Sequence, residues 1–481
     1  MGVIQRIPSG VLENDMSASL WRLSACELAA GIQTGVFSSR EAVSSCLQRA
    51  DATNGKINAL TEIRADAALA AADAADKAVA RGDSLGCLHG IPVTIKGNVD
   101  LAGWATVNGS ALLKENIARE TSPCVQNWLN AGAVIIGRTN TPEFSCRWET
   151  NNDVYGPTRN PWNPRLTAGG SSGGAAASVA AGITPLAHGT DLGGSLRQPA
   201  QACGVASIRP SLGRIPDYVP TEHEPSIGIQ LMNTDGLMAR RVADVRLGLK
   251  AMAVGDWRDP WWVPGPWEQP HRGDLPIAFI VDPLGQGVDQ QVALGVELAA
   301  GLLGAAGYGV EQAEPPTLAD AVRVWKMIVM GELFTGLEPA VTGSCSPSLR
   351  RMFAHYHQAV PDWTPEQYHL AFGERRKVLR DWLKFFQNYS VIVAPVSTRP
   401  PQVIDYDIAT PENTASTIED MRMVVAINAL GLPSAVVPVG MRDGLPQVVQ
   451  VIGAPFEEMR CLAVAEAIEQ RVDAITPANP A

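Results

Sequence analysis

Short runs of apolar and β-branched residues alternate with helical stretches between about residue 88 and Gly213. Ile91 to Ile95 predicts a buried strand, residues 122–131 predict a helix, and residues 133–136 predict another strand. The same alternation continues as far as Gly213. Strands and helices that alternate in this way indicate a layered α/β fold.

The N-terminal part carries clear signals for helix ends. Ser24 with Glu27, and Ser38 with Glu41, match the capping box, in which the serine and the glutamate satisfy free N–H groups at a helix start. A third helix is expected over residues 62–81, with its end at Gly82, where a left-handed cap residue usually stands.

The later part of the chain mixes irregular and helical patterns. Residues 214–275 are rich in Pro and Trp, which predicts irregular surface structure, whereas residues 290–305 and 316–388 show helical periodicity. A strand–turn–strand–helix is expected from Val391 to the end. No internal repeat and no clean linker occurs. A single domain over 1–481 is therefore expected, with a core at about 88–215, an irregular and helical insert on the substrate side at about 216–388, and a C-terminal core segment at 389–475.

Composition and charge exclude several classes of protein. The formal net charge is −11 and no Lys/Arg-rich run occurs, which argues against a nucleic-acid surface. No apolar stretch reaches the roughly 18 residues that span a bilayer, and residues 1–16 lack the apolar core of a signal peptide. The 8 cysteines are scattered without a CxxC pair or a Cys/His cluster, so no metal site and no disulfide framework is expected. These features predict a cytoplasmic protein without membrane or nucleic-acid partners.

Two Gly/Ser-rich loops carry the strongest chemical signal. Residues 168–174 read Ala-Gly-Gly-Ser-Ser-Gly-Gly, and residues 189–197 read Gly-Thr-Asp-Leu-Gly-Gly-Ser-Leu-Arg. Clustered glycines let backbone N–H groups approach a ligand closely. A serine hydroxyl beside such N–H groups suits acyl transfer, because the hydroxyl attacks and the N–H groups stabilise the oxyanion. One such loop alone is more often an ordinary turn, but two of them favour a catalytic site.

A serine nucleophile needs a base, and the sequence offers Lys96 rather than a histidine. The seven histidines suggest no triad partner, and His188 is best interpreted as a buried or loop residue. Lys96 ends the apolar run that starts at Ile91. A lysine can act as a base when burial makes it neutral near pH 7. By itself, however, a lysine in this position is more often a solvated surface charge.

The region from Gly90 to Gly213 resembles the signature region of the amidase signature family. The lysine segment, the first Gly/Ser loop and the Asp-x-Gly-Gly-Ser-x-Arg loop occur in the family's order, and Ser171 and Ser195 lie 24 residues apart as in the family. Further similar segments are Gly137 to Phe144, Asn160-Pro161-Trp162, Asn428-x-x-Gly431-Leu432-Pro433 and Gly444 to Gln450. The resemblance implies an α/β fold with a mixed, twisted β-sheet core covered by helices on both faces.

The resemblance also implies roles for individual residues. Ser195 would be the nucleophile that forms an acyl-enzyme, Ser171, preceded by a cis peptide in the family, would relay the proton, and Lys96 would be the base. The oxyanion would be bound by the backbone N–H groups of Leu192, Gly193, Gly194 and Ser195. Gly170 and Ser145 match substrate-side positions, and supporting roles fall to Ser172, Thr190, Asp191 and Arg197. No cofactor and no metal is implied.

This chain departs from the family pattern at a few places. Gly97 stands where an acidic residue commonly follows the lysine, Gln198 replaces an aliphatic residue, and Gln447-Val448 replaces Val-Gly. None of these changes removes a catalytic group. They put in doubt the shape of the surroundings of the site, and not the reaction.

The substrate is less clearly indicated. The expected reaction is hydrolysis of a small to medium amide with an apolar or aryl part, giving an acid and ammonia or an amine. An aromatic entrance could come from the tryptophans at 257, 261, 262 and 267 and from Trp325, Met327, Met330 and Phe334, although such residues are more often core. A carbamate, urea or allophanate hydrolase is an alternative that sequence does not separate, because the tetrahedral chemistry is shared. Thr141-Pro142-Glu143-Phe144 differs from the Asp-Glu-Phe segment of amidotransferase subunits, which makes that third class unfavourable. Relatives are often homodimers, so a homodimer is one expectation for this chain.

Overall fold

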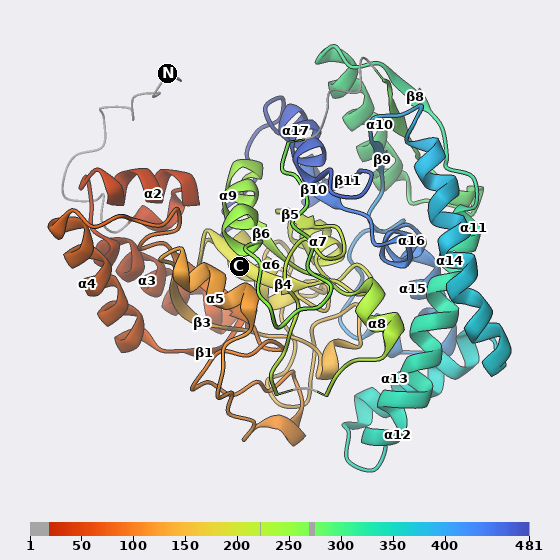
Figure 1. Cartoon of the computed structure of the whole chain (residues 1–481), viewed down its shortest axis with the longest axis horizontal. Coiled ribbons are helices and arrows are strands. Elements are labelled where there is room, and N and C mark those ends of the chain that lie inside the picture. Colours follow the sequence, from red (N-terminus) through yellow and green to blue (C-terminus); the bar gives the residue numbers. More distant parts are fainter. Residues whose placement is uncertain (1–18, 222, 269–274, 481) are drawn as a thin grey trace.

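The computed structural model describes residues 19–221, 223–268 and 275–480. They form a layered α/β structure around one 11-stranded sheet with the strand order β1-β3-β2-β4-β6-β5-β10-β11-β9-β7-β8 (Figure 1). The strands are β1 (Leu60–Ile63), β2 (Pro92–Lys96), β3 (Val134–Thr139), β4 (Leu186–Thr190), β5 (Ala206–Arg209), β6 (Asp235–Ala239), β7 (Ile277–Phe279), β8 (Val310–Gln312), β9 (Ile392–Ala394), β10 (Ser434–Arg442) and β11 (Leu445–Ile452). The sheet is mixed: β2 runs parallel to β3 and β4, whereas β6 runs antiparallel to β4 and β5.

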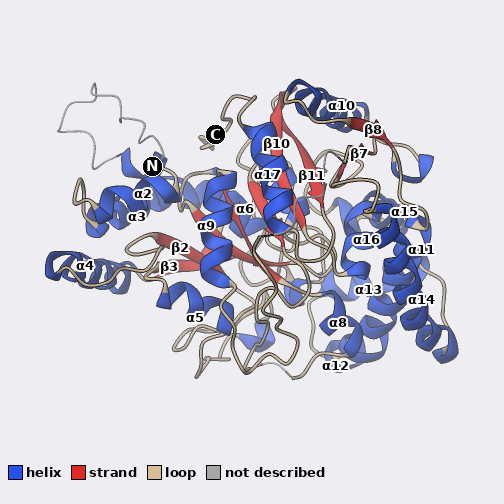
Figure 2. Ribbon diagram, turned by 45° about the horizontal axis from the view of Figure 1, so that its top comes forward, coloured by secondary structure: helices blue, strands red, loops and turns tan. Residues whose placement is uncertain are grey.

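Helices cover both faces of this sheet (Figure 2). They are α2 (Ala25–Gln33), α3 (Ser39–Ile57), α4 (Ala65–Arg81), α5 (Pro123–Asn130), α6 (Gly173–Ala180), α7 (Arg197–Cys203), α8 (Ile227–Met232), α9 (Val242–Met252), α10 (Gln290–Ala305), α11 (Leu318–Trp325), α12 (Glu338–Val341), α13 (Pro347–Ala359), α14 (Pro365–Phe385), α15 (Pro411–Asp420), α16 (Arg422–Leu430) and α17 (Glu458–Glu469). The predicted fold class is thereby confirmed. None of the helices within the described residues is long and apolar enough to cross a membrane.

Several local predictions are confirmed by the helix ends. Both expected capping boxes are present, at the starts of α2 and α3. The third helix ends at Gly82 in the left-handed conformation, with φ of 73°. That helix begins at Ala65 rather than at residue 62, because residues 60–63 pair with β3 as the edge strand β1.

The core consists of two apolar layers, one on each face of the sheet. Val93 and Ile95 of β2 pack in the layer that also contains residues of α5, α9 and α17. Because successive strand side chains point to opposite faces, Thr94 and Lys96 face the layer that contains α6, α7 and α16. The alternation of β2 therefore directs Lys96 toward the face on which both Gly/Ser loops start their helices.

The prediction of irregular structure over residues 214–275 is partly wrong. This stretch contains α8, β6 and α9, and β6 lies in the middle of the sheet, fully buried between β4 and β5. A five-residue strand is recognised by its pairing with neighbours rather than by its own pattern. The Trp-rich part at 253–268 does lack helix and strand. The insert is also not purely irregular and helical, because β7 and β8 extend the sheet from it.

The C-terminal part is more elaborate than predicted. Between β9 and the hairpin β10–β11 the chain forms the two helices α15 and α16, and α17 follows the hairpin. The hairpin and the last helix agree with the predicted pattern, but the two inserted helices were missed. The expectation about residues 1–16 lies outside the described residues. The predicted helices over 290–305 and 316–388 are confirmed as α10 and as α11 to α14, with π-helical turns at Lys326–Met330 and Leu333–Leu337.

Candidate active site

Lys96 lies at the C-terminal end of β2 and is completely buried. Its Nζ atom is 2.7 Å from Ser171 Oγ and 2.8 Å from Thr190 Oγ1. Asn98 Nδ2 donates to the same Thr190 hydroxyl over 3.2 Å. Burial lowers the pKa of the Lys96 ammonium to about 7, although the carboxylates of Asp191 and Asp235 oppose this shift. A substantial fraction of Lys96 is thus neutral near neutral pH and can accept a proton, so the surface interpretation of this residue is wrong.

Ser171 lies in the first Gly/Ser loop, two residues before the start of α6. The Gly170–Ser171 peptide bond is cis. The N–H of Gly170 donates to Gln198 Oε1 over 2.8 Å, which gives a defined role to a side chain that departs from the family pattern. Gly170 is required for space: a Cβ atom there would lie 2.5 Å from the backbone nitrogen of Glu149.

Ser195 begins the turn into α7 and is 8% exposed. The backbones of the two loops are joined by the N–H of Ser172, which donates to the Ser195 carbonyl over 3.3 Å. Within the described part of the chain, the Ser195 hydroxyl makes no hydrogen bond of its own. The structure thus brings Lys96 and Ser171 into direct contact and places Ser195 on the adjoining loop, without a hydroxyl–hydroxyl contact between the two serines.

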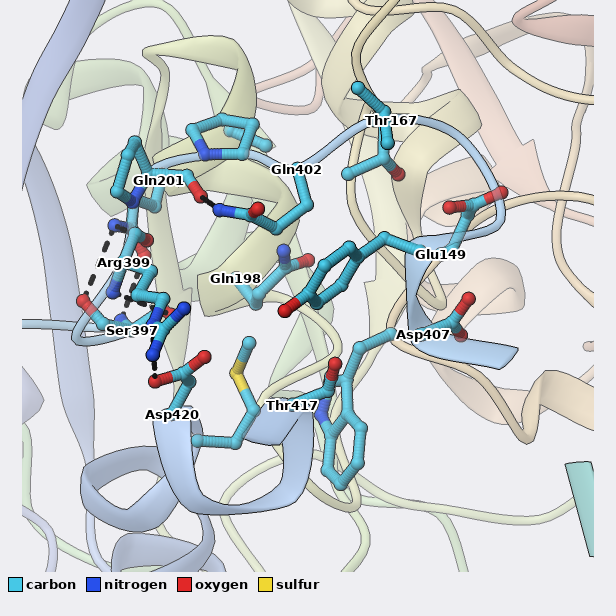
Figure 3. A pocket seen from close by; sticks show the side chains of 17 residues that line it. Glu149, Thr167, Gln198, Gln201, Ser397, Arg399, Gln402, Asp407, Thr417 and Asp420 are labelled. Atoms are coloured by element: carbon cyan, nitrogen blue, oxygen red, sulfur yellow. Dashed lines mark hydrogen bonds and ion pairs between the residues drawn. The ribbon is translucent and has the colours of Figure 1, made fainter. Parts of the chain in front are cut away.

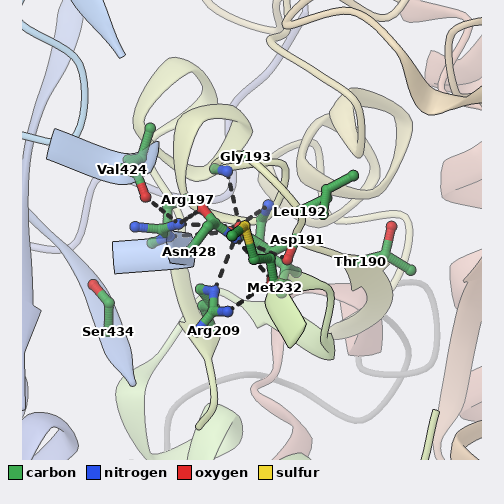
Figure 4. A network of polar contacts seen from close by, with 12 residues as sticks. Thr190, Asp191, Leu192, Gly193, Arg197, Arg209, Met232, Val424, Asn428 and Ser434 are labelled. Atoms are coloured by element: carbon green, nitrogen blue, oxygen red, sulfur yellow. Dashed lines mark hydrogen bonds and ion pairs between the residues drawn. The ribbon is translucent and has the colours of Figure 1, made fainter. Parts of the chain in front are cut away.

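Asp191 organises the second loop (Figure 4). Its carboxylate accepts from the backbone N–H groups of Gly194 over 2.8 Å and Leu196 over 3.1 Å. It also pairs with Arg197 at 3.0 Å, and Arg209 lies 3.7 Å away. Burial by itself would raise the pKa of Asp191, but the guanidinium groups of Arg197 and Arg209 hold that pKa well below its usual range. A permanently charged Asp191 therefore fixes the loop that carries Ser195.

The α16 helix completes this network. Asn428 Nδ2 donates to Asp191 Oδ1 over 2.8 Å and to the Asp191 carbonyl over 3.0 Å. Arg197 Nη2 donates to the Val424 carbonyl over 3.0 Å and to Asn428 Oδ1 over 2.6 Å. The sequence around Asn428 resembles the family, whereas Arg209 was missed, because an arginine at the end of a short apolar strand gives no local sign of its partner.

A prediction follows for the stability of this network. Asp191→Asn would leave the buried guanidinium groups of Arg197 and Arg209 without their counter-charge. Loss of one partner from a buried charged network costs about 3–5 kcal/mol of unfolding free energy. We expect this decrease in urea unfolding followed by circular dichroism. The control is Asp51→Asn on the exposed face of α3, which should change stability by less than about 0.5 kcal/mol; equal effects in both variants would contradict the assignment.

Not all backbone N–H groups of the second loop are free to bind an oxyanion. The Gly194 N–H is already donated to Asp191, which removes it from the set expected to face an oxyanion. Among the described residues, the N–H groups of Leu192, Gly193 and Ser195 have no hydrogen-bond partner. The correction has a physical cause: the positive φ of Gly194, 98°, turns its N–H back toward the carboxylate that holds the turn.

The remaining predicted site residues lie close by in supporting positions. Ser172 Oγ donates to the Thr190 carbonyl over 3.3 Å. Ser145 is half-buried, and its hydroxyl is hydrogen-bonded to Asn108 Oδ1 over 3.0 Å and lies 3.2 Å from Thr141 Oγ1. Ser145 therefore belongs to a neighbouring hydrogen-bonded turn, and no contact joins it directly to Lys96 or to the two serines.

The sequence patterns did not reveal a buried pair of His188 and Asp235 that lies next to the site. His188 Nε2 is 2.8 Å from Asp235 Oδ1 and 3.8 Å from Cys124 Sγ. Asp235 is paired across β4 and β6 with Thr190, the residue that contacts Lys96. His188 is buried, as expected, and no interaction joins it to Ser195. Its connection to Lys96 through Asp235 depends on strand pairing, which the sequence around His188 does not reveal.

Two clusters of potential metal ligands occur among the described residues. One is the Cys124, His188 and Asp235 group, and the other is formed by Glu149, Asp405 and Asp407. The buried Arg147 forms ion pairs with all three groups of the second cluster, and burial raises the pKa of Glu149 well above its usual value, which lowers the negative charge there. In the first, His188 already serves Asp235 as a hydrogen-bond partner. Protein contacts thus explain both clusters.

A cavity of about 130 Å³ adjoins the Lys96 end of the site. It reaches Asn98 and Thr190, and its wall includes Tyr218, His223 and Trp261, whereas Lys96 and the two serines do not line it. Trp261 is the one tryptophan of the Trp-rich stretch, as far as the structure describes it, that lines this cavity. The expected aromatic entrance is otherwise not formed: Trp257 is 92% exposed, and Trp325, Met327 and Met330 belong to the core, while Phe334 is half-buried against it.

Figure 3 shows a second cavity, of about 40 Å³, beside Gln198, Glu149 and Asp407. None of the three catalytic candidates lines it. Its wall is built by the segment around Trp148 and by residues 397–407, which Arg147 ties together through its ion pairs. This cavity therefore lies beside α7, which contributes Gln198 and Gln201 to its wall, and it is separate from the candidate catalytic side chains.

Comparison with known proteins decides the family. The family model for amidases matches residues 41–462. The chain belongs to the amidase signature family. Indoleacetamide hydrolase of Bradyrhizobium diazoefficiens is 41% identical over 456 residues, an alignment that covers 94% of this chain and 87% of that protein. A solved bacterial aryl acylamidase of the family has a TM-score of 0.80 at 26% identity and covers 93% of this chain and 96% of its own.

Relatives of the amidotransferase class are less similar to this chain than the indoleacetamide hydrolase. A glutamyl-tRNA(Gln) amidotransferase component from Chromohalobacter salexigens is 31% identical over 476 residues, covering 93% of this chain and 96% of that protein. The chain is thus an amidase, a hydrolase of amide C–N bonds other than peptide bonds. The predicted family, fold and reaction class are confirmed, and the amidotransferase alternative is disfavoured.

Proposed function

We propose that this amidase cleaves its substrate through an acyl-enzyme on Ser195, with Ser171 as proton relay and Lys96 as base. The observation that carries the proposal is the buried Lys96, whose pKa is lowered to about 7 and whose Nζ atom lies 2.7 Å from Ser171 Oγ. A base with a pKa near the working pH is the effective choice for proton transfer. Burial of a lysine costs free energy, and a role as base gives a reason for this cost.

The reaction then proceeds in two balanced halves. Ser195 Oγ forms a bond to the amide carbon, its proton passes to Ser171 Oγ, and the Ser171 proton passes to Lys96 Nζ. The C–N bond breaks as the leaving nitrogen takes up a proton along the same route. Water next attacks the ester, releases the acid and restores the Ser195 hydroxyl. The N–H groups of Leu192, Gly193 and Ser195 stabilise the oxyanion in both halves.

For the substrate we propose a primary amide of an arylacetic acid. The support is the 41% identity to an indoleacetamide hydrolase over nearly the full chain. The cavity that reaches Thr190, which contacts Lys96, and has Tyr218 and Trp261 in its wall is the proposed place for the aryl part. An aromatic wall favours a flat aryl group through dispersion and edge contacts. The products would be the aryl acid and ammonia.

The cytoplasm is the proposed location, and the protein is proposed to act alone or as a homodimer. All eight cysteines are free thiols, which supports a reducing compartment. A carbamate or urea hydrolase remains the alternative, because the same serine chemistry would cleave those C–N bonds.

The test is hydrolysis by the purified chain of a panel comprising indoleacetamide, phenylacetamide, acetamide, acetanilide, phenyl carbamate and phenylurea. Ammonia and the organic acid are both measured. We expect kcat/KM for the two arylacetamides to exceed that for acetamide and acetanilide by at least about ten-fold, roughly 1.4 kcal/mol. Higher kcat/KM for the carbamate or urea would replace the substrate proposal. No amide hydrolysis by the chain alone would contradict the autonomous amidase.

A further inference from the structure

The carbonyl groups of the Ser195 loop are anchored on the side away from the free N–H groups. Asn428 Nδ2 donates to the Asp191 carbonyl over 3.0 Å, and the Gln198 N–H donates to the Gly194 carbonyl over 2.7 Å. In a trans peptide the C=O and the following N–H point in opposite directions. Anchoring these two carbonyls therefore directs the N–H groups of Leu192 and Ser195 to the opposite side of the loop.

The other two carbonyls of the loop are held by tryptophan side chains. Trp325 Nε1 donates to the Leu192 carbonyl over 2.9 Å, and Trp148 Nε1 donates to the Gly193 carbonyl over 2.7 Å. The two indole rings contact each other with centroids 6.0 Å apart. Trp325 also packs directly over Gly193, where an added Cβ would lie 2.8 Å from the ring. Both tryptophans are almost fully buried, so their orientation is fixed by packing.

The two indole contacts have different consequences for the site. The Leu192 carbonyl shares its peptide with the N–H of Gly193, which has no partner within the described residues. The Gly193 carbonyl shares its peptide with the N–H of Gly194, which already donates to Asp191. Trp325 thus orients a donor that is free to meet an oxyanion, whereas Trp148 orients a donor that is already used.

We infer that Trp325 is a positioning residue for the oxyanion-binding N–H of Gly193, supplied to the catalytic loop by the helical part of the insert. Trp325 is the last residue of α11, where the helix passes into the π-helical turn Lys326–Met330, and α11 packs on α16, the helix that carries Asn428. The insert and α16 together hold the outer side of the loop. The inference rests on the proposed role of Ser195.

The test compares Trp325→Phe with the matched Trp148→Phe, which loses the same kind of hydrogen bond one peptide further on. Removal of an oxyanion donor costs about 10²–10³ in kcat, and loosening one should cost less. We expect Trp325→Phe to lower kcat for phenylacetamide by about ten- to thirty-fold with KM changed less than about three-fold. The fold-decrease of kcat in Trp148→Phe should be at least about five times smaller than in Trp325→Phe, because the N–H group that Trp148 orients is not offered to the oxyanion.

A second readout is the inhibition constant of benzyl trifluoromethyl ketone, whose serine adduct places an oxyanion in the same position. In Trp325→Phe this inhibition constant should rise by the same factor by which kcat/KM falls, while the dissociation constant of phenylacetone stays the same. Replacement of Trp325 by benzothienylalanine, which keeps the bicyclic shape and lacks the N–H, should give the same pattern if the phenylalanine variant does not fold. Equal losses in the two Trp→Phe variants, or a change confined to KM, would overturn the inference alone. Ketone binding that is unaffected by Ser195→Ala would overturn the proposed function with it.

Discussion

Ser195→Ala is expected to lower kcat for arylacetamide hydrolysis by about 10⁴-fold or more, with little change in stability. The hydroxyl is the atom that forms the acyl bond, and removal of a serine nucleophile abolishes nearly all of the rate beyond that supplied by oxyanion binding. Ser195 is 8% exposed, and its Oγ atom makes no hydrogen bond among the described residues. The variant therefore loses no hydrogen bond of the fold, and its free energy of unfolding should change little. Ammonia release and urea unfolding would measure the two effects.

The matched control for this variant is Ser178→Ala. Ser178 is a fully buried serine on α6 whose hydroxyl donates to the Ala175 carbonyl over 2.8 Å, outside the candidate site. Its replacement should leave kcat within about two-fold, since an ordinary buried hydroxyl contributes about 1 kcal/mol to stability and nothing to the chemistry. A fluorophosphonate probe should label the wild type and Ser178→Ala and fail to label Ser195→Ala. Activity retained in Ser195→Ala would rule out the proposed nucleophile.

Lys96→Ala is expected to lower kcat/KM by about 10³-fold and to remove the acid limb of its pH profile. General-base catalysis contributes about 10²–10⁴-fold. With the pKa of Lys96 lowered to about 7 by burial, the amine is protonated and inactive as a base below pH 7 and neutral above it. In the wild type, kcat/KM should therefore rise with pH through about 7 and reach a plateau about one unit higher. A limb that persists unchanged in Lys96→Ala would have to be assigned to another group.

The position of this limb should respond to Asp235. The Asp235 carboxylate raises the pKa of Lys96 and so opposes the effect of burial. The charged groups that face Lys96 are Asp191 and Asp235, and Asp235 in turn is faced by His188 and Cys124. Asp235→Asn removes one negative charge and should move the acid limb of kcat/KM to lower pH. The control is Asp244→Asn, a buried aspartate bonded to the N–H of Cys26, which should leave the limb in place; a shift to higher pH in Asp235→Asn would contradict the proposed coupling.

The local patterns of this sequence predicted much of the fold. The strand β2, the helix α5, both capping boxes and the end of α4 at Gly82 were predicted because each depends on residues within a few positions of one another. The order and spacing of the lysine segment and the two Gly/Ser loops likewise indicated the family and its candidate residues. Short strands such as β6 were missed, because pairing with β4 and β5 defines them more than their own composition.

The sequence by itself thus determined the layered fold class, the amidase family and the identity of the candidate serines and lysine. Only the tertiary structure decided that Lys96 is buried, since the same strand end in an edge position would leave it solvated. It also decided that Gly194 serves Asp191 rather than an oxyanion, and that Trp325 reaches Leu192 from 133 residues away. Such contacts follow from the order of strands in the sheet and the packing of helices upon it, and these depend on interactions between segments that no local pattern records.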